Sequence, residues 1–264
     1  MFNLEFMRNA FWASTFISIV SGLIGVFVIS RNMSFLTHTL SEIGFAGASF
    51  ALFMGWTSLN GMLLFVILSS LMVGRLSQEQ SKRETVISAT SALFIGIGIL
   101  FLYLSSKTAS SATSILFGSV IGISRSEVWQ LIALSMLVIG VVFLIYRPLK
   151  FSSFDPVGSK TNGNNEQFIS IVFLLLLALS VSVAVQIVGT LLIFVLLTLP
   201  AASARAFTSG SAKMIFIAII FALIGTWTGL YLGYLTSWPV TFFTAVIEVL
   251  IYLFSLIYQH YKEN

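Results

Sequence analysis

The chain has 264 residues, of which 58% are hydrophobic and 8% charged, and it contains no cysteine. A soluble domain carries about 25% charged residues, so this composition excludes a soluble globule and predicts one transmembrane domain over residues 1–264. The net charge of +4 comes from Lys and Arg spread over membrane loops, which gives no support to nucleic-acid binding. Without thiolates, a metal ion would need imidazole, carboxylate or other oxygen ligands.

Apolar segments long enough to cross a bilayer follow one another along the chain, and they predict an all-α bundle of about nine spans. The first four are residues 11–30, 33–54, 59–73 and 85–104. The fifth is 128–146, the sixth and seventh are 168–183 and 188–200, the eighth follows Lys213 and ends at Leu235, and the ninth is 240–257. Residues 114–123 are too short to span and predict a re-entrant or surface half-helix, which the spacing of Gly118 and Gly122 would dock on the bundle.

The run between Glu166 and Arg205 contains no charged residue. At about 1.5 Å per residue it would be nearly twice as long as a bilayer core is thick, so it must fold back on itself. Gln186 and Gly189 mark the expected reversal, and Pro200 is expected to end the second of the two spans. In the eighth span, the ridge formed by Gly225, Gly229 and Gly233 predicts a helix-packing face, with a subunit interface as the alternative.

The positive charges predict the orientation of the chain in the membrane. With nine spans, ten Lys and Arg fall on one side and three on the other, so the first side is predicted to be cytoplasmic, with the N-terminus outside and the C-terminus inside. The ten are Arg31, Arg75, Lys82, Arg83, Arg147, Lys150, Lys160, Arg205, Lys213 and Lys262; the three are Arg8, Lys107 and Arg125.

Three ionisable side chains lie inside two of the apolar spans. His38 and Glu42 are four residues apart, so on a helix they share a face and can both contact one ion or each other. They are either a transport site or a structural pair that ties two helices together. Glu248 stands alone in the ninth span, either as a second polar point on the transport pathway or as a protonated carboxyl within the packing.

Four stretches carry a family resemblance over most of the chain. They are Gly-Val-Phe-Val-Ile-Ser-Arg-Asn-Met-Ser-Phe-Leu from Gly25, Ser-Ile-Leu-Phe-Gly-Ser-Val from Ser114, Phe-Asp-Pro at 154–156, and an apolar run from Val188 that closes in Leu-Pro-Ala-Ala-Ser-Ala-Arg at Arg205. The chain resembles the permease subunit of the ABC importers that take up zinc, manganese or iron(II), which are related to the B12 and siderophore importers.

This resemblance implies an assembly and a set of site residues. It implies a homodimer in a bacterial cytoplasmic membrane, with a cytoplasmic ATPase pair below and an extracellular metal-binding lipoprotein above. In the family pattern an aspartate and, four residues later, a histidine follow the Arg-x-Met element, whereas this chain has His38 and then Glu42. The pair is then expected to contact a divalent ion as cargo, and Pro200, Ala201, Ala202 and Arg205 to belong to the segment that contacts the ATPase.

Other functions make different demands on the sequence. A secondary transporter usually shows repeated halves, and an intramembrane enzyme needs a catalytic constellation; neither pattern is found. No G-x-x-x-x-G-K-[ST] motif occurs, so the chain is predicted to be a transport subunit whose ATP is hydrolysed by another chain. The swapped order of His38 and Glu42 bears on the choice of metal and leaves a non-metal cargo, such as a metal chelate, as the alternative.

Overall fold

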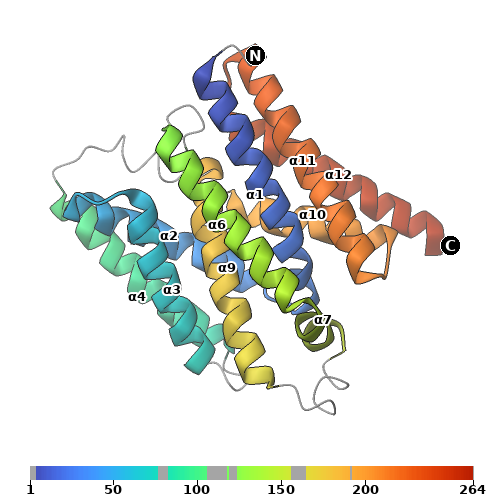
Figure 1. The fold of residues 1–264 in the computed structure, drawn as a ribbon, viewed down its shortest axis with the longest axis horizontal. Coiled ribbons are helices and arrows are strands. Elements are labelled where there is room, and N and C mark those ends of the chain that lie inside the picture. The colour runs from blue at the N-terminus through green and yellow to red at the C-terminus, as the bar shows by residue number, and fades with distance from the viewer. Residues whose placement is uncertain are drawn as a thin grey trace.

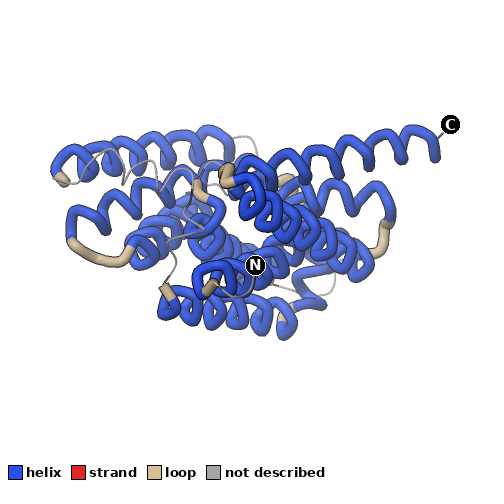
Figure 2. Tube along the Cα trace, turned by 90° about the horizontal axis from the view of Figure 1, so that it is seen from above, coloured by secondary structure: helices blue, strands red, loops and turns tan. Residues whose placement is uncertain are grey.

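The computed structural model describes residues 4–76, 83–105, 118, 124–155, 165–190 and 192–263. Within these ranges the chain forms α-helices and no strand (Figures 1 and 2). The helices are α1 (Glu5–Ser30), α2 (Ser34–Met54), α3 (Ser58–Leu76), α4 (Arg83–Leu104), α6 (Arg125–Leu144), α7 (Tyr146–Phe154), α9 (Glu166–Val188), α10 (Ile193–Phe207), α11 (Ser211–Thr236) and α12 (Val240–Glu263). The all-α bundle predicted from the sequence is confirmed.

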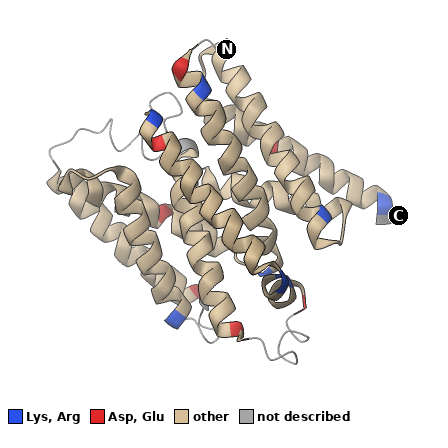
Figure 3. Ribbon diagram, in the orientation of Figure 1, with Lys and Arg blue, Asp and Glu red and all other residues tan. Residues whose placement is uncertain are grey.

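Each of the nine predicted spans lies mainly on one of these helices, although the fifth ends in α7 and the seventh begins at the last residue of α9. In the described part of the chain, seven helices are long and apolar enough to cross a membrane: α1, α3, α4, α6, α9, α11 and α12. The remaining two predicted spans correspond to α2, which carries His38 and Glu42, and to α10, which has 15 residues. The charged residues drawn in Figure 3 lie mostly at helix ends, as a bilayer requires. The half-helix predicted at 114–123 lies, except for Gly118, outside the described residues.

The bundle is divided by the long helix α9. Helices α2, α3 and α4 pack together on one side of it, and α1, α10, α11 and α12 pack together on the other (Figure 1). Helix α9 contacts both groups, and its Phe173 meets Phe27 of α1 edge-to-face with ring centroids 6.5 Å apart. Both phenylalanines are fully buried, so the two groups share one apolar core.

The glycine ridge predicted on the eighth span is a packing face within the chain. A Cβ atom built on Gly225, Gly229 or Gly233 would collide with Glu248, Thr244 or Val240 of α12, respectively. These three partners are spaced four residues apart, so one stripe of α12 fills the groove along α11. The face considered as an alternative subunit interface is therefore occupied by the chain's own last helix.

Two details of the expected helix ends differ from the structure. The reversal after α9 lies at Gly189, as predicted, because its φ of 78° ends the helix; α9 itself runs five residues beyond the predicted end of the sixth span. Pro200 does not end the seventh span, because α10 continues through it to Phe207. A proline removes one backbone donor, and the good helix formers that follow it carry the helix for two more turns. That prediction for Pro200 was wrong.

Candidate functional site

His38 and Glu42 lie on one face of α2, one turn apart. Their side chains are 48% and 41% exposed in the single chain, and His38 Nδ1 is 3.7 Å from Glu42 Oε1. The opposite face of α2 is buried by close packing: Gly47 meets Gly61 of α3 with no space for a side chain on either glycine. The buried face therefore fixes the orientation of the helix, and this orientation leaves the pair uncovered.

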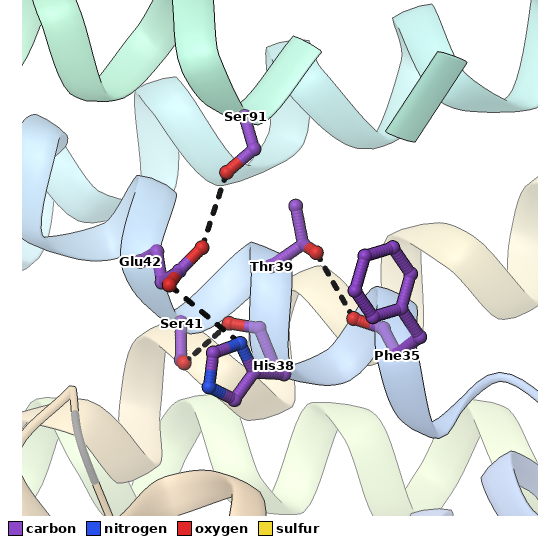
Figure 4. Close-up of polar contacts among 6 residues, drawn as sticks. All are labelled: Phe35, His38, Thr39, Ser41, Glu42 and Ser91. Atoms are coloured by element: carbon purple, nitrogen blue, oxygen red, sulfur yellow. Dashed lines mark hydrogen bonds and ion pairs between the residues drawn. The ribbon is translucent and has the colours of Figure 1, made fainter. Parts of the chain in front are cut away.

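Two neighbouring helices contribute side chains around the pair. From α10, the ring of Phe194 meets the imidazole of His38 edge-on, with centroids 5.5 Å apart. From α4, Ser91 Oγ donates a hydrogen bond of 3.2 Å to Glu42 Oε2 (Figure 4). Within α2, Ser41 Oγ donates to the carbonyl oxygen of His38. The pair thus lies where α2, α4 and α10 meet, and neither side chain is enclosed by that contact.

Exposure of this kind has a specific meaning in a membrane bundle. An ionisable side chain that faces lipid is costly, so such residues face a water-filled cavity or another protein. Along α2 the pair is flanked by Thr37, Thr39 and Ser41, and beyond these by apolar side chains and glycines. The uncovered face is therefore better matched to an aqueous pathway or to a second chain than to acyl chains.

The geometry of the pair suits a shared ion. A tetrahedral ion bound by both atoms at about 2.0–2.2 Å would place them about 3.4 Å apart, close to the 3.7 Å found and longer than a hydrogen bond. Among the described residues, no group of three or more His, Cys, Asp or Glu side chains could hold a metal. One chain therefore offers one nitrogen and one carboxylate ligand, which is too few for a tight site.

Glu248 lies in a different environment from the pair. It is 0% exposed, and neither carboxylate oxygen has a hydrogen-bond partner among the residues that the structure describes. Its carboxyl group fills the notch at Gly225, where an added Cβ atom would be 2.7 Å from Glu248 Cδ. The structure therefore brings His38 and Glu42 together and sets Glu248 against α11; whether Glu248 belongs to the pathway stays a prediction.

The predicted ATPase-coupling residues lie in the second half of α10. Pro200 and Ala201 are buried, Ala202 is half-buried and Arg205 is exposed. Arg205 lines a polar cavity of about 610 Å³ together with the ends of α1 and α12, α7 and the turn between α10 and α11. Segments that are far apart in the sequence therefore meet at this cavity.

Short polar contacts hold the edge of this cavity. Arg31, directly after α1, donates from Nε to Ser153 Oγ at 2.8 Å and from Nη2 to Ser152 Oγ at 2.9 Å. Its guanidinium also lies 4.7 Å from the centroid of the Phe173 ring. These contacts fix α7 against the ends of α1 and α9, so the short helix has a defined place beside the cavity.

Sequence reasoning missed three contributors to these sites. Ser91 and Phe194 reach the pair from helices far from α2 in the sequence, and the short helix α7, which follows the fifth span, was not predicted. Nothing local marks Ser91, because serine is common in membrane helices.

Comparisons with known proteins agree with this architecture. The model of the ABC 3 transport family matches residues 3–259. A manganese transport system membrane protein, MntC of Listeria monocytogenes, is 32% identical over 232 residues, which is 88% of this chain and 82% of that protein.

Solved structures with a similar fold extend the comparison. PsaBC of Streptococcus pneumoniae, solved in complex with a Fab, has a TM-score of 0.86 and 25% sequence identity, covering 96% of this chain and 91% of its own. An inward-facing metal-chelate type ABC transporter has a TM-score of 0.71 at 17% identity, covering 95% and 86%, and so shows the fold alone. This chain belongs to the ABC 3 transport family, as a multi-pass membrane permease subunit.

Proposed function

We propose that this chain is the permease of an ABC importer for a divalent metal ion, with manganese as the first candidate. The family match and the manganese transport protein of Listeria monocytogenes support this cargo. Zinc and iron(II) are the other candidates, because an imidazole beside a carboxylate suits first-row ions, whereas all-oxygen sites suit Ca²⁺ and Mg²⁺. The ion is cargo that passes through the protein.

The proposed assembly places two copies of the chain in a bacterial cytoplasmic membrane. Nine helices cross the bilayer, with the N-terminus outside and the C-terminus in the cytoplasm, in the manner of the B12 and siderophore importers. A metal-binding lipoprotein delivers the ion from outside, and a pair of ATPase chains binds on the cytoplasmic side. ATP binding and hydrolysis then rock the helices and move the ion past the pair.

One observation carries the metal proposal: His38 and Glu42 are half-exposed on a helix whose opposite face is tightly packed. In a homodimer the two-fold axis can bring two such pairs together and supply four ligands. Four ligands complete a tetrahedral or partly open shell, and a shell assembled from two chains can open again to release the ion. The face that is uncovered in one chain is then covered by its copy.

Replacement of either residue by alanine tests this proposal. His38→Ala and Glu42→Ala are each expected to lower metal accumulation in cells by at least about 100-fold, because loss of even an outer-shell partner costs about 10–100-fold. Thr39→Val, on the buried side of the same helix, is the matched control and should transport normally. Membrane abundance and ATPase binding of each variant are measured alongside.

The opposite result would redirect the proposal. Normal accumulation of manganese, zinc and iron in both alanine variants would make the pair a structural contact between helices. A chelate cargo would then be the better hypothesis for the same fold.

We also propose that the second half of α10, with Pro200, Ala201, Ala202 and Arg205, transmits motion from the ATPase. Support comes from the polar cavity that Arg205 shares with the ends of α1 and α12. A cysteine at exposed Ser209 should crosslink to the ATPase, whereas one at exposed Asn60, in the first turn of α3, should not. Ser211 is less suitable, because it is buried and hydrogen-bonds Tyr146. Transport in proteoliposomes without any ATPase would contradict this assembly.

A further inference from the structure

The two carboxylate oxygens of Glu42 have different partners. Oε1 faces His38 Nδ1 at 3.7 Å, and Oε2 accepts a hydrogen bond of 3.2 Å from Ser91 Oγ (Figure 4). His38 is on the same helix as Glu42, whereas Ser91 is on α4. The carboxylate is therefore held from one side and open on the other.

The hydrogen bond from Ser91 differs from those of other buried serines. Ser49, Ser180 and Ser182 each donate to a carbonyl oxygen four residues earlier in their own helix, which is the usual solution in an apolar span. Ser91 instead donates across the helix interface to the one carboxylate on α2. Its hydroxyl thus acts on the site and not on its own backbone.

Packing fixes the position of this donor. Ser91 is 6% exposed, and further along α4 a Cβ atom added to Gly98 would be 2.5 Å from the Cα of Ala46 on α2. Helices α2 and α4 therefore touch at the backbone close to Glu42, and this contact holds their relative register. The backbone at Ser91 therefore cannot move away from Glu42 without separating the two helices.

We propose that Ser91 is a positioning residue that sets the metal selectivity of the pair by keeping Glu42 a one-oxygen ligand. This inference rests on the proposed function. With Oε2 engaged by Ser91, Glu42 presents Oε1 beside the imidazole nitrogen, which gives one nitrogen and one oxygen ligand per chain. Such a set suits Mn²⁺, Fe²⁺ and Zn²⁺, whereas Ca²⁺ takes six to eight oxygen ligands and often binds a carboxylate through both oxygens.

Loss of the hydroxyl should therefore have two effects. Glu42 becomes free to rotate, which weakens binding of the transported ion, and it becomes able to bind Ca²⁺ through both oxygens. Phe194, edge-on to His38, still restrains the imidazole, so the disturbance falls on the carboxylate. A role for Ser91 in packing alone would lower the amount of folded protein and would not change competition between metals.

The test compares Ser91→Ala, Ser91→Val and Ser91→Thr in a host that lacks its own manganese importers and expresses the complete transporter. Valine and threonine have similar shapes, so their difference isolates the hydroxyl group. We measure the KM and maximal rate of manganese uptake and the Ca²⁺ concentration that halves it. Ser49→Ala, which removes a buried hydroxyl bonded within α2, is the matched control.

The expected result is a KM raised about tenfold in the alanine and valine variants, with little change in maximal rate and stronger inhibition by Ca²⁺. The threonine variant and Ser49→Ala should resemble the wild type. Equal KM and Ca²⁺ inhibition in the valine and threonine variants would overturn the inference; the alanine variant replaces valine if the latter does not reach the membrane. If His38→Ala and Glu42→Ala retain uptake, the proposed function fails independently of Ser91.

Discussion

In the described part of the chain, two acids lie away from the helix ends, Glu42 on α2 and Glu248 on α12, and their surroundings are opposite. Glu42 is 41% exposed, lies one turn from His38 and accepts a hydrogen bond from another helix. Glu248 is 0% exposed, has no hydrogen-bond partner within the described ranges, and fills a notch at a glycine. The burial of Glu248 is complete within a single chain, whereas the site around Glu42 is open.

The contrast shows that an acid in an apolar span is not by itself a transport site. A ligand must be reachable by the ion and must have other ligands beside it, and Glu42 meets both conditions through its exposed face and His38. Glu248 meets neither in the described residues, and its contact with Gly225 favours the packing alternative left open by the sequence.

The largest expected difference comes from removing the charge of each acid while keeping its shape. Glu42→Gln should lower metal uptake by at least about 100-fold, because the ion loses its only charged ligand from that chain. Glu248→Gln should keep most of the uptake, because glutamine fills the same notch at Gly225. Metal accumulation is normalised to the amount of permease in the membrane.

Loss of uptake in both glutamine variants would place Glu248 on the pathway after all. Normal uptake in both variants would show that neither acid is needed as a ligand, and the proposed difference between Glu42 and Glu248 would then be lost.

A smaller effect, on thermal stability, is expected when the notch at Gly225 that holds the Glu248 carboxyl group is filled. Gly225→Ala adds a Cβ atom that would be 2.7 Å from Glu248 Cδ, and overpacking of this kind costs about 1–3 kcal/mol, or roughly 2–10 °C in melting temperature. Gly96→Ala on α4 is the matched control, because an added Cβ atom there meets nothing within 4 Å.

The double variant Gly225→Ala with Glu248→Ala sharpens this measurement. If the carboxyl group fills the notch, the shorter side chain should relieve the collision, so the two changes should cost less together than their sum. Strict additivity in thermal unfolding of the purified permease would contradict the packing seen between α11 and α12.

Much of the fold could be predicted because the length of each apolar segment indicates whether it can cross a bilayer as a helix. Each apolar run of about 20 residues had to become a helix, since a bilayer leaves no other partner for the backbone. The helix ends were harder: Gly189 sets the reversal through a positive φ, and Pro200 was absorbed within α10. A proline is a weak stop signal when good helix formers follow it.

The candidate site could be predicted only in part. The four-residue spacing of His38 and Glu42 is local, so it could be read directly from the sequence. Their exposure, the hydrogen bond from Ser91 and the contact with Phe194 depend on how α2, α4 and α10 cross, which no local pattern encodes. The surroundings of Glu248 are likewise set by the register between α11 and α12.

The shortness of α10 has a mechanical consequence. Its first turn holds Phe194 against His38, and eleven residues later Arg205 lines the polar cavity at its other end. These two points are about 16 Å apart along one continuous helix. Under the proposed coupling, a tilt imposed at Arg205 is expected to be carried along this helix to the ring beside His38, with no relay of intervening side chains required.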